Sequence, residues 1–221
     1  LLLDVTPLSL SIETMGGICT KVIERTQTIP TRQSKIFTTA ANFQTNVDIK
    51  IYQGERQFAR DNKLLGNFRL SKIQRALAGV PQIEVTFDID VNGIVKVSAK
   101  DLASGRAQEI VISGSSNMSD AEIERAIANA KAYEERDKKG YGNFEIYQDA
   151  ERTIARVTNA LNDKTVKKSL SFEEKSNIKN AQKQVMKLHG KIKPDDISDS
   201  QAAELKEALS VLKEAASKLL N

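Results

Sequence analysis

The chain has 221 residues, a formal net charge of +4 and 40% hydrophobic residues, which is enough to build one large domain or two small ones. No apolar run approaches the roughly eighteen residues needed to cross a bilayer, so we expect no membrane span and no membrane partner. The 14 basic and 11 acidic residues of 1–113 give +3, and the 19 basic and 18 acidic residues of 114–221 give +1. Charges that alternate in sign along the helical segments, with only 5% aromatic residues, also disfavour a nucleic-acid binder.

The first residues, Leu1-Leu2-Leu3-Asp4, are apolar and are not preceded by a methionine. We expect a piece cut from a longer polypeptide at a linker. Cys19 is the only cysteine, so no internal disulfide can form. A reducing, cytoplasmic location fits this best.

From residue 5 to about 113 the apolar residues recur at every second position, which is typical of half-buried antiparallel strands. Examples are Val47, Ile49, Ile51; Ile83, Val85, Phe87, Ile89; Val95, Val97, Ala99; and Ile110, Ile112. The Asn92-Gly93 pair predicts a two-residue hairpin in which both central residues have positive φ. Further turns are predicted at Gly16-Gly17, Gly54, Gly66, Gly79 and Gly105. Many short strands with regular turns predict a β-sandwich.

After a connector at 114–118 the pattern changes to that of helices over 119–221. Ser119 and Glu122 form a predicted capping box, with Met118 and Ile123 as its hydrophobic staple. Three amphipathic stripes follow, and they comprise Ala150, Ile154, Val157, Leu161; Ile178, Ala181, Val185, Leu188; and Leu205, Leu209, Leu212, Ala216, Leu219. Ser171 with Glu174 and Ser198 with Gln201 are candidate caps, and the stretch 193–196 separates the last two helices. The fold class is therefore α+β with segregated parts, an antiparallel sandwich followed by a helical bundle.

Few residues offer catalytic chemistry. His189 is the only histidine and lies at a lysine-rich helix end before Gly190, where a solvated helix residue is the simplest interpretation. The sequence has no second histidine, and no residue is spaced from Cys19 as a second metal ligand would be. A role as a small apolar residue is therefore favoured over a role as a nucleophile or metal ligand. The glycine-rich loop that cradles phosphate is absent from the sequence. We expect a binding protein with no catalytic residues, metal site or cofactor of its own.

Several short strings carry a resemblance to a known family. They are LLLDVTPLSLSIET, GGICTKVIER, TIPT, QGER, DNKLLGNF, PQIEVTFDIDVNGIVKVSAKD and SGRAQEIVI. In order and spacing they resemble the Hsp70 chaperones of the bacterial DnaK type, densely over 1–113 and more weakly from about residue 119. The resemblance implies an interdomain linker at 1–4, a peptide-binding sandwich at 5–113, a connector at 114–118 and a helical lid at 119–221. It also implies an ATPase domain, with ATP and Mg, on the missing N-terminal side.

Matching the family motifs position by position implies a set of site residues. The pocket would be lined by Ile12, Ile18, Phe37, Val47 and Ile49. Met15 and Ala40 would bridge the bound peptide, while Thr14, Thr38, Ala40 and Gln44 would offer polar contacts. The linker would comprise Leu1, Leu2, Leu3 and Asp4, and Arg25 would lie at the interdomain contact. By pattern alone, Ile12, Val47 and Ile49 could equally be ordinary core residues. Met15, at a turn before two glycines, is more suggestive of a binding role.

The resemblance also implies a mechanism, and this sequence differs from the family pattern at a few positions. Family members bind extended hydrophobic segments of unfolded polypeptides under a helical lid that ATP opens, and they act in protein folding and the stress response with a J-domain co-chaperone and a nucleotide-exchange factor. Ala78 stands where many relatives have an arginine that pairs with an acid, here Glu151, so the lid latch is in doubt. Gly140 and Gly142 each cost about 1 kcal/mol in a helix relative to alanine, which predicts a hinge or bulge in the lid.

Two alternatives to a peptide-binding chaperone fragment stay open. One is an Hsp70-like scaffold or interaction module whose groove does not bind. The other is an unrelated protein with β and helical parts. We also expect self-association, because a leucine-rich terminus could enter a neighbour's groove.

Overall fold

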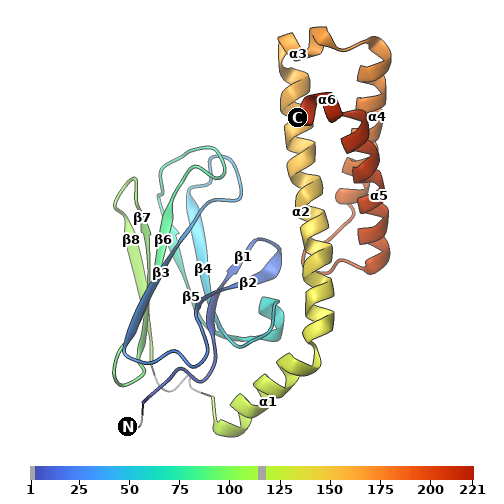
Figure 1. Cartoon of the computed structure of the whole chain (residues 1–221). Coiled ribbons are helices and arrows are strands. Elements are labelled where there is room, and N and C mark those ends of the chain that lie inside the picture. Colours follow the sequence, from blue (N-terminus) through green and yellow to red (C-terminus); the bar gives the residue numbers. More distant parts are fainter. Residues whose placement is uncertain (1–2, 114–117) are drawn as a thin grey trace. The chain divides into compact units, whose positions relative to one another are not determined.

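The computed structural model describes residues 3–113 and 118–221 (Figure 1). The chain divides into two compact units, residues 1–134 and 135–221. Helix α1 therefore belongs with the sandwich, whereas the sequence places the boundary before it, at 114–118. The predicted ranges of the linker, peptide-binding part and lid stay predictions.

The first unit is a sandwich of two four-stranded antiparallel sheets, which confirms the predicted fold class. One sheet has the order β2-β1-β4-β5 and the other β3-β6-β7-β8. The strands are β1 (Leu10–Thr14), β2 (Ile18–Ile23), β3 (Thr31–Phe37), β4 (Asn46–Gln53), β5 (Lys63–Ser71), β6 (Ile83–Ile89), β7 (Val95–Asp101) and β8 (Ala107–Ile112). Short 3-10 turns lie at Met15–Gly17 and Ala59–Asp61.

The alternating apolar positions form the core between the two sheets, as predicted. Ile51, Ile83, Val85, Phe87 and Val97 are fully buried in one cluster. Their sequence neighbours are half-buried or exposed, except Thr86, which is buried and hydrogen-bonded to Ser34. This is the period-2 arrangement of strands with one buried face. Side chains from both sheets enter this cluster.

The β6–β7 hairpin forms where Asn92-Gly93 predicts it, but the predicted turn type is wrong. Only Gly93 has positive φ, at 78°. The Gly93 N–H donates to the Asp90 carbonyl, and the Asp90 carboxylate accepts from the N–H groups of Asn92 and Ile94. The carboxylate stabilises a longer turn, in which asparagine keeps negative φ and only glycine takes the left-handed region.

Gly66 is not at a turn, contrary to the prediction. It lies within β5 opposite Ile51, next to an irregularity in the β4–β5 register. A Cβ atom there would be 3.2 Å from the Ile110 side chain. Close approach of the two sheets, rather than chain reversal, explains the glycine.

The helices are α1 (Asp120–Ala132), α2 (Glu134–Asn162), α3 (Lys164–Ser169), α4 (Phe172–His189), α5 (Asp199–Ala215) and α6 (Ser217–Leu220). All three predicted capping boxes are present, at Ser119, Ser171 and Ser198. In the second unit, α2, α4 and α5 contribute to one core that includes Val157, Ile178, Val185, Leu205 and Leu212. Among the described residues, no helix is both long enough and apolar enough to span a bilayer.

Helix α2 runs without interruption through Gly140 and Gly142, so the predicted hinge or bulge at these glycines is wrong. A helix tolerates glycine at a cost of about 1 kcal/mol when its hydrogen-bond ladder is otherwise complete. The chain instead leaves helical geometry at Tyr133, the C-cap of α1, which has φ −101° and ψ 7°. The helix break precedes the glycines by seven residues.

Candidate functional site

The β1–β2 turn has a well-fixed backbone and a free side chain. Gly16 and Gly17 have φ values of 81° and 70°, which glycine adopts without strain. The Thr14 hydroxyl donates to the Ile18 carbonyl at 3.1 Å and lies 3.0 Å from the Thr20 hydroxyl. Met15, at the first position of the turn, is 45% exposed. A large, adaptable apolar side chain is thus presented to solvent on a turn held by hydrogen bonds.

The β3–β4 loop is held by its own glutamine. The Gln44 side-chain oxygen accepts from the N–H groups of Ala40 and Ala41, both at 3.2 Å, and its nitrogen donates to the Asn46 carbonyl at 2.7 Å. Thr38 and Ala40 are exposed. Gln44 therefore fixes the loop that carries Ala40, and its predicted contact with a bound peptide stays a prediction.

The β5–β6 loop is bonded to the β3–β4 loop along its length. The contacts are Phe43 N–H to the Ala76 carbonyl (2.7 Å), Ile73 N–H to the Thr45 carbonyl (3.0 Å), Gly79 N–H to the Thr39 carbonyl (3.2 Å) and Ala78 N–H to the Asn42 side-chain oxygen (2.9 Å). Ala78 itself is exposed. The two loops form one structural element, so a substitution at Ala78 also affects the loop that contains Ala40.

The predicted pocket residues divide between core and near-core positions. Ile12 and Ile49 are buried in the sandwich core, and Phe37 and Val47 are half-buried against the same cluster. Ile18 is buried at the start of β2, where it pairs with Thr14 and forms a bridge with Phe58. The structure brings four of the five residues to one cluster. Their role in lining a pocket stays a prediction.

The register of β1 and β4 decides where the β1–β2 turn lies relative to the β3–β4 loop. Ile12 lies opposite Ile51 in an antiparallel pair, so β1 ends beside the first half of β4. The β1–β2 turn and the β3–β4 loop therefore emerge at the same end of this sheet. Met15 and the loop that carries Ala40 therefore lie at the same end of this sheet, and their predicted contact with a bound peptide stays a prediction.

The predicted linker and interdomain residues lie toward the other end of β1. Leu1 and Leu2 fall outside the described residues. Leu3 is exposed, while the Asp4 carbonyl already accepts from the Ile29 N–H at 3.0 Å. The Arg25 guanidinium lies 3.8 Å from the Glu55 carboxylate, and that carboxylate accepts from the N–H and hydroxyl of the buried Ser9. Arg25 is thus anchored to a buried polar cluster.

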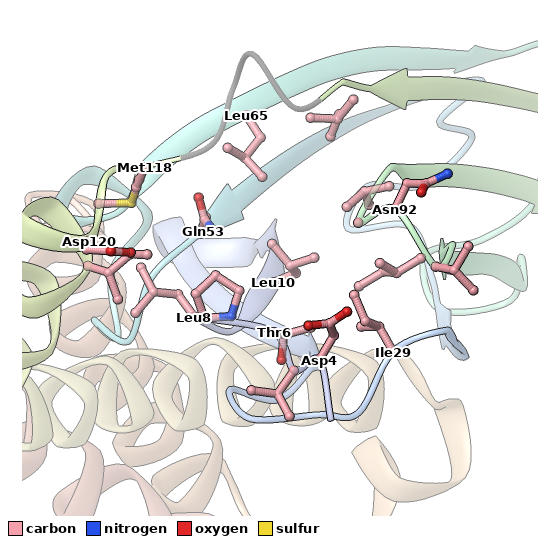
Figure 2. Close-up of a pocket in the computed structure, with 18 residues that line it drawn as sticks. Asp4, Thr6, Leu8, Leu10, Ile29, Gln53, Leu65, Asn92, Met118 and Asp120 are labelled. Atoms are coloured by element: carbon pink, nitrogen blue, oxygen red, sulfur yellow. The ribbon is translucent and has the colours of Figure 1, made fainter. Parts of the chain in front are cut away.

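A cavity of about 390 Å³ lies at this end of the sandwich (Figure 2). Figure 2 shows side chains from several chain stretches around it, among them the N-terminal segment from Asp4 to Leu10, Ile29, Gln53 of β4, Leu65 of β5, the hairpin at Asn92, and Met118 and Asp120 at the start of α1. Its walls are mostly aliphatic. Gln53 is only 7% exposed, and its side-chain oxygen has no hydrogen-bond partner within the described ranges.

This cavity was not predicted from the sequence, although one signal pointed to it. Gln53 shares the inward face of β4 with Ile51 and Ile49, two and four residues before it. A polar residue on an otherwise apolar face marks a departure from ordinary core packing. Met118 and Ile123, the predicted staple of α1, both line the cavity.

The β4–β5 loop contacts both β2 and the end of α1. The Asn62 side-chain nitrogen donates to the Arg56 carbonyl at 2.7 Å and to the Cys19 sulfur at 3.3 Å. The Arg56 guanidinium lies 4.5 Å from the centre of the Tyr133 ring, a cation–π geometry. Burial raises the pKa of the Cys19 thiol despite the Asn62 bond, which keeps the thiol protonated and supports its apolar role.

His189 is not a solvated helix residue, contrary to the prediction. Its ring stacks on Tyr147 with centroids 4.2 Å apart. Burial lowers its pKa, an effect that Glu151 opposes, so the neutral ring is favoured. The amphipathic pattern missed this contact because Tyr147 is on α2, 42 residues earlier.

The predicted latch pair is split between the two units, with Ala78 in the first and the exposed Glu151 in the second. Its existence stays a prediction. Across residues 3–113 and 118–221, no group of three or more His, Cys, Asp or Glu side chains is arranged to hold a metal ion.

A comparison with protein-family models gives one match over nearly the whole chain. The model described as "Hsp70 protein" matches residues 1–220. The match covers both the sandwich and the helices.

Proposed function

The chain belongs to the Hsp70 family of chaperones, and from this membership we propose that its sandwich binds extended, apolar segments of unfolded polypeptides, as in the DnaK-type members. The observation that carries the proposal is the exposed Met15 on a hydrogen-bonded turn, at the same end of the sheet as the Gln44-fixed loop. Such a site needs a fixed frame with an adaptable apolar side chain. Met15 and its turn supply both.

Recognition in the proposed site is largely independent of sequence. Main-chain hydrogen bonds to an extended segment do not depend on its side chains, and one apolar pocket selects only for a residue of leucine-like or isoleucine-like size. The half-buried Val47 and Phe37 are the best candidates for that pocket's wall, because they contact the core and still have exposed surface. Folded proteins hide such segments, so unfolded chains are the expected ligands.

The finer parts of the proposal concern control. We propose that the helical unit acts as a lid, and that an ATPase domain joined through residues 1–4 opens it by population shift between closed and open states. A J-domain co-chaperone and a nucleotide-exchange factor would act on that domain. The present chain would bind peptide without hydrolysing ATP. Cytoplasmic location, a stress-response role and self-association through the linker stay predictions.

The test is a fluorescence-anisotropy titration with a labelled leucine-rich peptide. Val47→Phe should fill the pocket and weaken binding by about five- to a hundredfold, because overpacking costs about 1–3 kcal/mol. Val111→Phe is the matched control, since Val111 is exposed on β8 at the sheet's outer edge. Circular dichroism establishes that both variants fold. Equal affinity of Val47→Phe and wild type would contradict the pocket, and absence of binding by wild type would favour the scaffold alternative.

A further inference from the structure

Helix α4 has an outward face of uniform positive charge. Ile178 and Val185 are fully buried and fix which side of the helix faces the core of its unit. Away from that side lie the half-buried Lys175 and the exposed Lys179, Lys183 and Lys187, spaced four residues apart. At about 100° per residue they fall within an arc of about 120° and along about 18 Å of the helix.

The charges on this face do not alternate in sign, contrary to the sequence expectation for the helices. Residues 164–193 contain nine lysines and two glutamates, and no acid lies between Glu174 and Asp195. Glu174 is engaged by the Ser171 cap and by Lys218 of α6. Those contacts hold the pKa of its carboxyl at about 2. The acid nearest to these lysines along α4 is therefore paired with Ser171 and Lys218.

Two apolar side chains lie on the same face as the lysines. Phe172, at the start of α4, is 88% exposed, and Met186 near its end is about half exposed. By helical spacing both fall within the arc that contains the four lysines. An aromatic ring left almost fully in water at a helix start has no role in the core of its own unit.

We propose, against the sequence expectation of no membrane partner, that this face of α4 docks on an anionic membrane surface, with the lysines at the headgroups and Phe172 in the interface. All four cations are lysine, a point charge on a flexible stem, which suits many mobile phosphates rather than one fixed bidentate partner. Each lysine near an anionic surface contributes about 1 kcal/mol, which is about fivefold in partitioning. Four together give reversible attraction, and Phe172 adds the apolar contact typical of interfacial helices.

Other anionic partners fit the face less well. Bidentate recognition of one fixed phosphate favours arginine forks, and single-stranded nucleic acid uses several aromatic rings for stacking. The face offers four lysines and one ring. An acidic peptide would need a groove, whereas the outward side of one helix is convex.

The experiment is co-flotation of the 221-residue chain with vesicles of phosphatidylcholine alone or of a three-to-one mixture with phosphatidylserine. We expect binding only to the mixed vesicles, and weaker binding as salt is raised. Replacing Lys175, Lys179, Lys183 and Lys187 by glutamine should weaken it by up to about several-hundredfold, given roughly fivefold for each of the four lysines. Phe172→Ala should weaken it a further few-fold, while Val211→Ala, an exposed apolar residue on α5, should not.

The matched control removes four exposed lysines elsewhere, with the same change in net charge: Lys96, Lys100, Lys131 and Lys206 to glutamine. It should bind like wild type, and thermal melts establish that both variants fold. Equal loss in the two quadruple variants, or no binding by wild type, would overturn the proposal. So would loss of binding when excess leucine-rich peptide fills the groove, or tighter lysine-dependent binding to polyuridylate or polyglutamate than to the mixed vesicles.

Discussion

The two units secure their irregular segments in different ways. In the helical unit, the starts of α4 and α5 are closed by capping boxes between residues three apart, Ser171 with Glu174 and Ser198 with Gln201. In the sandwich, local bonds such as those of Gln44 and Asp90 are joined by bonds between residues far apart in sequence. Examples are Asn42 with Ala78, 36 residues apart, and Asp101 with Gln74, 27 apart. Local chemistry defines the helix ends, whereas the sandwich loops depend on the complete fold.

This difference bears on where binding sites can be built. A capping box needs only residues three apart, so its contacts involve no distant element. The β3–β4 and β5–β6 loops, which are hydrogen-bonded to each other, keep their shape only while both sheets are packed. Damage to the sandwich core should therefore reach the candidate peptide site, and damage to the helical core should not change that site's own geometry.

The largest expected effect comes from the sandwich core. Phe87 is fully buried at the centre of its cluster, so Phe87→Ala should lower the free energy of unfolding of the first unit by about 3–5 kcal/mol. Hydrogen-exchange mass spectrometry measures this separately for peptides of each unit. Val111→Ala is the exposed control and should change stability by less than about 0.5 kcal/mol. An equal loss of protection in residues 135–221 would show that the units do not unfold separately.

Asp101 tests the long-range support of the loops. Burial raises its pKa, but hydrogen bonds from the Ser104 hydroxyl and the backbone of Gln74 and Ala103 outweigh this, so the folded-state pKa is lowered. The unfolded chain then binds more protons near its ordinary pKa of about 3.9, and the stability from this group is present above that pH and lost below it.

Asp101→Asn should accordingly cost about 1–3 kcal/mol at neutral pH, the usual penalty for disrupting a buried polar network. It should also flatten the decline of stability between about pH 6 and pH 3. Urea unfolding across that range measures both effects. The exposed Glu109→Gln, on β8, should retain the wild-type pH profile, and an unchanged profile for Asp101→Asn would refute the assignment.

Two glycines in the helical unit test how local helix propensity contributes to its stability. A Cβ atom at Gly142 meets no atom within 4 Å, whereas at Gly190 it would lie 3.2 Å from the Met186 carbonyl oxygen. Gly142→Ala should stabilise the helical unit by up to about 1 kcal/mol. Gly190→Ala should stabilise the unit less, because the contact with the Met186 carbonyl oxygen offsets the higher helix propensity of alanine. Thermal melts followed by circular dichroism measure both, and a larger gain at Gly190 would contradict the packing.

The smallest expected effect concerns Ala78 in the β5–β6 loop. If the helical unit is the proposed lid, Ala78→Arg would add a cation for Glu151, a partly exposed pair worth about 0.2–1 kcal/mol. Peptide release should then slow by a few-fold at most, since affinity changes of this kind appear mainly in dissociation. Stopped-flow release from wild type, Ala78→Arg and Ala78→Gln measures it. The neutral glutamine variant separates charge from size, and equal slowing in both would exclude the ion pair.

Helix ends, strand faces and the sandwich class were readable from the sequence because their causes are local. Ser119, Ser171 and Ser198 each meet their partner three residues on, and alternation along β4, β6 and β7 needs only one buried face per strand. The short helices α3 and α6 were missed because segments of four to six residues carry too few periodic positions. The site residues came from the family resemblance, since alternation cannot separate a pocket wall at Val47 from core.

Tertiary structure alone decided the remaining features, because each joins residues that the sequence keeps apart. The stacking of His189 on Tyr147, the close approach of Gly66 to Ile110, and the cavity around Gln53 all depend on how separate elements pack. The Asp90 carboxylate likewise overrode the turn expected for Asn92-Gly93. The sequence by itself determined which residues form elements and which faces are apolar, while packing decided which side chains meet.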